Sequence, residues 1–122
     1  MARPRPTRPP LLRLLLVAAA GLPATAAHAQ TVADDARCLF LSNAYASRAT
    51  DPARRQIATS AGAYFLGRLD GRASPAAIRT AFAESGKLKT AEASSLMNAC
   101  VRRAERADMR MREVLGPATQ GR

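Results

Sequence analysis

Two cysteines, Cys38 and Cys100, constrain the fold more than any other feature of this 122-residue sequence. They are the only cysteines, and no Cys-x-x-Cys motif is present, which argues against a thioredoxin-like redox site and covalent haem attachment. Two such thiols pair in an oxidising compartment, whereas the cytosol keeps them reduced. The compartment therefore decides whether these residues close the chain into a loop.

The first 29 residues show the three parts of a secretory signal peptide in the expected order. The basic part contains four arginines, namely Arg3, Arg5, Arg8 and Arg13. An apolar run from Leu14 to Leu22 follows, and Ala27-His28-Ala29 fits the cleavage pattern. The run is much shorter than the roughly 20 residues of a membrane-spanning helix, although an uncleaved anchor is the alternative. We expect cleavage after Ala29 and a periplasmic or secreted product with no transmembrane segment.

Residues 30–122 would then form a single small domain that contains both cysteines. A domain of this size buries only about 60–65% of its unfolded surface, so its core needs extra support. We expect a Cys38–Cys100 disulfide to supply that support, since an even number of thiols leaves none unpaired.

Apolar residues spaced by three and four predict an all-α domain of four helices. Thr31 or Asp34 is expected to cap the first helix, which extends to about Ser47. The other three are expected at 52–69, 75–85 and 91–115, with residues 116–122 as a loose tail. Asp51-Pro52 and Ser74-Pro75 are typical helix starts, and Gly71 suits a left-handed helix end.

Each predicted helix carries an apolar stripe that should face the core. The stripes are Cys38, Leu41 and Tyr45; Ile57, Ala61, Tyr64, Phe65 and Leu69; Ile78 and Phe82; and Leu96 or Met97, Cys100, Ala104, Ala107, Met111 and Leu115. Gly62 and Gly67 would allow a neighbouring helix to approach the second helix closely. Both cysteines lie on stripes, so both are expected to point inward.

The residue types needed for catalysis are sparse. The only histidine, His28, leaves with the signal peptide, which removes the commonest general base and metal ligand. Asp34 and Asp35 are expected to complement the dipole of the first helix. Glu105 and Asp108 share a helix face but have arginine neighbours, which favours surface ion pairs over a glycosidase site. We predict no enzyme activity, no metal and no cofactor.

Arginines are concentrated in the last predicted helix, at Arg102, Arg103, Arg106, Arg110 and Arg112. Four of the 19 basic residues and none of the nine acidic ones precede Gln30, so residues 30–122 carry a formal charge of +6. These five arginines are a candidate anion-binding surface, and a solvated outer helix face is the alternative. A GC-rich genome would also enrich arginine without any function. Export and only five aromatic side chains make nucleic acid a poor partner.

The placement of Cys38, Cys100 and the intervening aromatic pair Tyr64-Phe65 resembles the small periplasmic acid-stress chaperones of the HdeA type. The resemblance covers the architecture of the mature chain: export, helices and one disulfide joining an early helix to a late one. It implies a non-enzymatic stress protein whose partners are unfolded client proteins. The other hypothesis from the residues is a basic helical module that binds an anionic envelope component: a lipid headgroup, lipopolysaccharide or an acidic protein.

Overall fold

A computed structural model describes residues 30–116, and this part of the chain is all-α, as the sequence predicts. It contains four helices: α1 (Val32–Arg48), α2 (Pro52–Leu69), α3 (Pro75–Ser85) and α4 (Thr90–Leu115). The predicted signal peptide and all but the first residue of the predicted loose tail lie outside the described residues. Between residues 30 and 116, no helix is long and apolar enough to cross a membrane.

Local capping chemistry explains where three helices begin. Thr31 caps α1 in a capping box, in which its hydroxyl accepts from the Asp34 backbone N–H while the Asp34 carboxylate accepts from the Thr31 backbone. The Asp51 and Ser74 side chains cap α2 and α3, and a proline follows each cap. Gly71 has a φ of +69°, the left-handed conformation expected just after α2.

The start of α4 differs from the prediction. The helix begins at Thr90 rather than Ala91, and Lys89 occupies the N-cap position without a side-chain hydrogen bond. Thr90 is therefore part of the first helical turn. The backbone N–H of Ala93 donates to the Lys89 carbonyl, which closes that turn.

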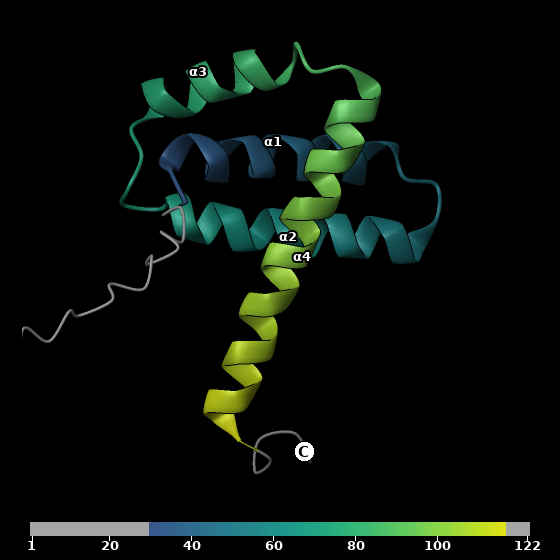
Figure 1. Cartoon of the computed structure of the whole chain (residues 1–122), viewed down its shortest axis with the longest axis vertical. Coiled ribbons are helices and arrows are strands. Elements are labelled where there is room, and N and C mark those ends of the chain that lie inside the picture. Colours follow the sequence, from purple (N-terminus) through teal and green to yellow (C-terminus); the bar gives the residue numbers. More distant parts are fainter. Residues whose placement is uncertain (1–29, 117–122) are drawn as a thin grey trace, which may run out of the picture.

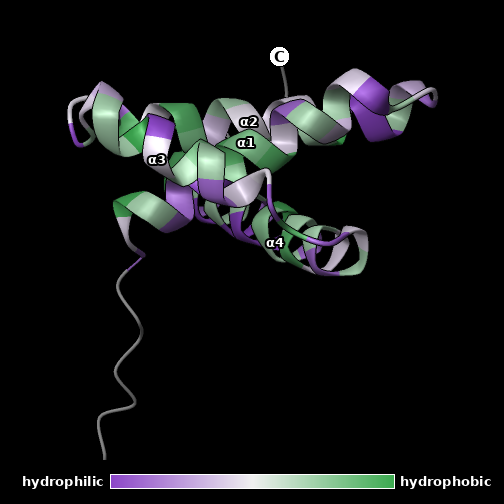
Figure 2. Cartoon of the chain, turned by 90° about the horizontal axis from the view of Figure 1, so that it is seen from above, coloured by the Kyte–Doolittle hydropathy of each residue, from purple (hydrophilic) through white to green (hydrophobic). Residues whose placement is uncertain are grey.

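Helices α1, α2 and α3 lie side by side, and α1 contacts both of the others (Figure 1). Helix α4 crosses one face of this layer, and the view from above shows it on one side of α1 and α2 (Figure 2). It contacts both of these helices, whereas it makes no close contact with α3. The fold is thus a three-helix layer with a fourth helix across it.

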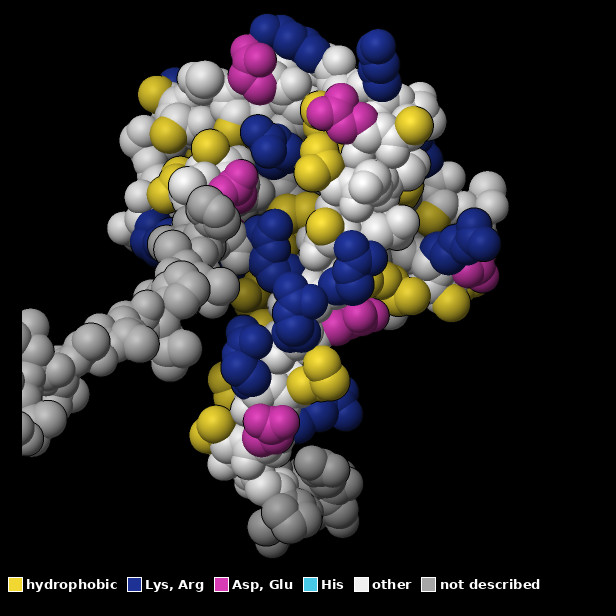
Figure 3. Space-filling model, in the orientation of Figure 1, with side chains coloured by type: hydrophobic (Ala, Val, Ile, Leu, Met, Phe, Trp, Pro, Cys, Tyr) yellow, Lys and Arg dark blue, Asp and Glu magenta, His cyan; other side chains and the backbone are white. Residues whose placement is uncertain are grey.

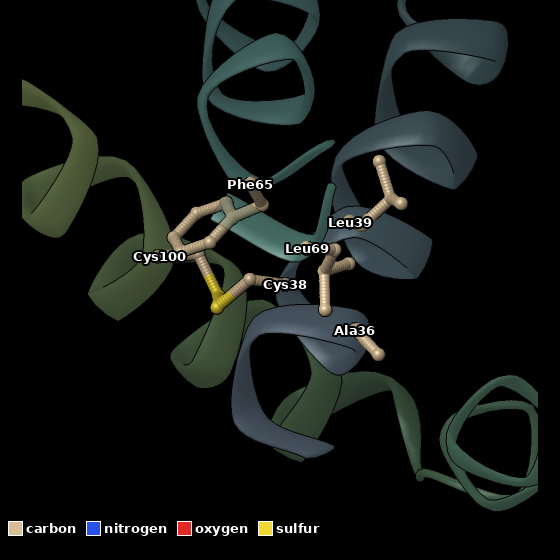
Figure 4. Packing of buried hydrophobic residues seen from close by; sticks show 6 residues of the cluster. All are labelled: Ala36, Cys38, Leu39, Phe65, Leu69 and Cys100. Atoms are coloured by element: carbon tan, nitrogen blue, oxygen red, sulfur yellow. A yellow bond between two sulfur atoms is a disulfide. The ribbon is translucent and has the colours of Figure 1, made fainter. Parts of the chain in front are cut away.

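The core lies where α1, α2 and α4 meet, and the Cys38–Cys100 disulfide runs through it (Figure 4). The predicted pairing is confirmed: the two Cα atoms are 5.5 Å apart, and both cysteines are buried. The Phe65 ring packs in the same cluster and is fully buried. A second link joins the Tyr45 and Ser94 hydroxyls, 2.7 Å apart, between α1 and α4.

The two helical glycines of α2 have different surroundings. A Cβ atom at Gly62 would lie 3.3 Å from both Ser42 and Asn43 of α1, so this glycine allows the predicted close approach. A Cβ atom at Gly67 would meet nothing within 4 Å, so the same prediction for Gly67 is wrong. Gly67 occupies the exposed side of α2, where no helix packs.

Candidate functional site

The apolar stripe of α4 is covered over only half of its length. Met97 and Cys100 are buried, but Met111 is 57% exposed and Leu115 is 53% exposed. The helix has 26 residues, which corresponds to about 39 Å, and its C-terminal half extends beyond α2 (Figure 1). The predicted burial of Met111 and Leu115 is therefore wrong, because the layer ends before the stripe does.

An apolar groove lies between α2 and this half of α4, with a volume of about 570 Å³. Its apolar wall consists of Ile57, Ala61, Tyr64, Val101, Ala104, Ala107 and Met111. Ile57, which we predicted to face the core, is 49% exposed because α4 diverges from the N-terminal half of α2. The small side chains Ala104 and Ala107 leave the groove open.

Polar side chains also line the groove, and the charged ones among them include both acidic and basic residues. Gln56 and Ser60 line the α2 side, while Glu105, Asp108 and Arg112 line the α4 side. The Arg112 Nε donates to Asp108 Oδ2 at 2.8 Å, and both side chains are more than half exposed. Such a surface ion pair contributes little to stability and can exchange partners readily.

Three of the five predicted anion-binding arginines form one exposed row along α4. Arg102, Arg106 and Arg110 recur every four residues and are exposed, and none of them pairs with an acid in the described part of the chain. Helical geometry puts this row opposite the groove. Figure 3 shows basic side chains gathered on the side of α4 that faces away from α1 and α2. We refer to Arg102, Arg106 and Arg110 as the arginine row.

The other two predicted arginines occupy different environments. The Arg103 guanidinium lies over the Phe65 ring, 5.7 Å from its centroid, and its Nη1 is buried with no hydrogen-bond partner among residues 30–116. Arg112 lines the groove and pairs with Asp108. The structure therefore does not bring the five predicted residues together on one surface.

Sequence reasoning missed the buried carboxylate of Asp35. This side chain is fully buried, and its Oδ2 accepts from Arg68 Nε at 2.9 Å and from Arg72 Nη1 at 3.0 Å. Its Oδ1 has no hydrogen-bond partner within the described residues. The sequence spacing does indicate this burial, since Asp35 precedes Cys38 by three residues and therefore lies on the same helix face.

The two neighbouring carboxylates at the start of α1 thus have different roles. Asp34 complements the helix terminus as predicted, and the Thr31 hydroxyl that donates to it lowers the pKa of its carboxyl group. Asp35 instead ties α1 to the C-terminal end of α2. Burial alone would lower the pKa of the Arg68 guanidinium, but the hydrogen bond and charge of Asp35 outweigh this effect and raise it.

Residues 30–116 contain no group of three or more His, Cys, Asp or Glu side chains able to hold a metal ion. The described surface includes the apolar groove, the projecting end of α4 and the arginine row. No protein-family model, curated protein or solved structure matches this chain. The resemblance to the acid-stress chaperones stays a prediction.

Proposed function

We propose that this protein is an exported, non-enzymatic, chaperone-like protein that holds apolar segments of client proteins in the groove between α2 and α4. The observation that carries this proposal is the half-exposed apolar wall at Ile57 and Met111. Apolar surface of this kind, framed by polar side chains, is typical of sites that bind protein segments.

Low pH would strengthen such an activity. Neutralising the nine carboxylates changes the formal charge of residues 30–122 from +6 to +15. Repulsion among these charges loosens a compact fold and exposes more of the apolar stripes. We therefore propose that the protein acts when the compartment expected from its signal peptide, the periplasm of a Gram-negative bacterium or the cell exterior, becomes acidic.

The test is the aggregation of a client protein at about pH 2–3, where carboxyl groups are protonated, and at neutral pH. Light scattering is followed with and without an equimolar amount of the protein. Met111→Gln in the groove should weaken the suppression of aggregation. Leu66→Gln is the matched control, because Leu66 is 58% exposed against 57% for Met111 but does not line the groove. No suppression by the unmodified protein, or equal loss in both variants, would contradict the proposal.

A second function is favoured by the arginine row. Three exposed guanidinium groups repeat every four residues without acidic partners in the described chain, a pattern that suits an anionic component of the cell envelope. Changing Arg102, Arg106 and Arg110 together to Gln should weaken binding to anionic liposomes, and binding should fall steeply with added salt. Intact binding by this triple variant would rule the function out.

A further inference from the structure

We infer that the thioether of Met111 is a site of reversible oxidation, and that its conversion to the sulfoxide weakens the binding of apolar segments in the groove between α2 and α4. Because that groove is the proposed client site, the inference rests on the first proposed function and names a way in which it is regulated. The oxidant is a two-electron oxidant of the peroxide class.

The methionines carry the sulfur atoms that are open to such an oxidant in the described part of the chain. Cys38 and Cys100 are joined to each other and buried, so neither presents a thiol. A thiol reacts as its thiolate and loses reactivity in acid, whereas a thioether has no proton to lose. The reactivity of methionine would therefore persist in the acidic conditions in which we propose that the protein acts.

The three methionines of residues 30–116 differ in their exposure. Met97 is 5% exposed, and the Ser42 hydroxyl donates to its sulfur at 3.9 Å. Met109 is 54% exposed and Met111 is 57% exposed. Because oxidation follows exposure, Met109 and Met111 should react readily and Met97 slowly.

Only one of the two exposed methionines lies in the groove. The Met111 side chain forms part of the apolar wall together with Ala104 and Ala107, and Met109 is not among the groove residues. Two residues of a helix correspond to a rotation of about 200°, so Met109 and Met111 lie on nearly opposite sides of α4. The structure therefore provides one exposed methionine whose oxidation alters the groove and one whose oxidation does not.

The chemistry places a polar group where the groove is apolar. A lone pair of the Met111 sulfur attacks one oxygen of hydrogen peroxide, so that an S–O bond forms and the O–O bond breaks. The departing hydroxide takes the proton from the transferred oxygen and leaves as water. The sulfur is oxidised by two electrons and the peroxide is reduced by two. The resulting sulfoxide is polar and retains water beside Ala104 and Ala107, where an apolar client side chain would pack.

The fold should survive this modification. Met111 belongs to the half of α4 that extends beyond α2 (Figure 1), and it is not part of either buried core cluster. Met97, in contrast, packs with Leu41 and Ala58 in the core, so its oxidation would cost stability. Weaker groove binding with unchanged stability is thus the result expected for Met111.

The test measures the binding of a neutral apolar dye, N-phenyl-1-naphthylamine, before and after treatment of the protein with dilute hydrogen peroxide. A neutral dye has no net attraction to the arginine row. Tandem mass spectrometry locates each added oxygen atom. Oxidation should weaken dye binding by about fivefold or more, since one apolar side chain of the groove loses its contact. The thermal midpoint should stay the same.

Met111→Leu and Met109→Leu are matched variants, because each removes one exposed sulfur from the same helix. Leucine is apolar and close to methionine in volume, and peroxide does not oxidise it. Each variant is compared with its own untreated form, so that differences in starting affinity do not enter. Dye binding should remain sensitive to peroxide in Met109→Leu and become insensitive in Met111→Leu.

The outcomes separate this inference from the function on which it rests. Unchanged dye binding after complete sulfoxide formation at Met111, or equal peroxide sensitivity in the two variants, overturns the inference and leaves client binding untouched. If the dye responds as expected but the untreated protein does not suppress client aggregation, the first function fails and the oxidation site stands. If the untreated protein binds no dye, the groove is not an apolar binding site and both fail.

Discussion

The Nε of Arg68 on α2 donates to the fully buried carboxylate of Asp35 on α1 at 2.9 Å. Arg72 donates to the same oxygen, so one buried acid binds two arginines that are 32% and 44% exposed. A buried carboxylate that loses its partners cannot turn toward water, whereas the arginines can. We therefore expect loss of the two arginines to cost more stability than loss of the carboxylate.

Replacing Arg68 and Arg72 together by Met should therefore destabilise the protein by about 3–5 kcal/mol, the cost of leaving a buried charge unpaired. Adding Asp35→Leu to this double variant should recover much of the loss, since no buried charge then remains. Urea unfolding of the single, double and triple variants measures the coupling. A triple variant no more stable than the double variant would show that Asp35 is not the source of the cost.

Reduction of the Cys38–Cys100 disulfide is the second prediction. The bond encloses 61 residues, and the chain-entropy account gives such a loop about 4 kcal/mol. This is a large share of the stability of a small domain, so reductant should lower the thermal midpoint markedly. Thiol titration verifies the redox state. An unchanged midpoint after complete reduction would show that packing alone holds α1 against α4.

The two glycines of α2 provide a matched pair of substitutions. Gly67→Ala should stabilise the protein by up to about 1 kcal/mol, because alanine favours the helix and the new Cβ meets nothing within 4 Å. Gly62→Ala gains the same propensity but places its Cβ 3.3 Å from Ser42 and Asn43. It should therefore be the less stable of the two variants in thermal unfolding, and the opposite order would mean that α1 and α2 separate easily.

The pH dependence of stability should include a contribution from Asp34. The Thr31 hydroxyl lowers the pKa of its carboxyl group below 3.8, and the Arg37 and Arg103 charges lower it further against the opposing effect of burial. Because the pKa is lower in the folded state, this contribution is present above pH 3.8 and is lost as the pH falls through the folded-state pKa. Thr31→Ala should reduce it and Thr31→Ser should retain it, as measured by urea unfolding across that pH range.

The helix boundaries could be predicted because short-range chemistry determines them, and the disulfide could be predicted because two thiols in an oxidising compartment have only each other to pair with. Proline after Asp51 and after Ser74 marks a helix start whatever packs nearby, and Gly71 marks an end. Periodicity also identified the inward faces of Cys38 and Cys100 correctly. None of these features depends on where the neighbouring helices end.

The site could not be predicted in the same way, because its features depend on how far one helix overlaps another. The stripes containing Ile57 and Met111 have core spacing, yet α2 and α4 diverge and leave both residues half exposed. Asp35 was assigned the same role as Asp34, complementing the helix dipole. Its position three residues before Cys38 nevertheless puts it on the core side of α1. The arginines were treated as one cluster, but helix rotation separates Arg103 and Arg112 from the row.

Hydrogen exchange along α4 tests whether its C-terminal half is uncovered in solution. Amides near Cys100 should exchange slowly because the disulfide and the core hold that turn, whereas amides from about Ala107 to Leu115 should exchange much faster. A short helical segment without tertiary contacts is only marginally stable in water. Uniform protection along α4 in the free protein would mean that the stripe at Met111 is already covered, and neither the groove nor the helix end would then be available to a partner.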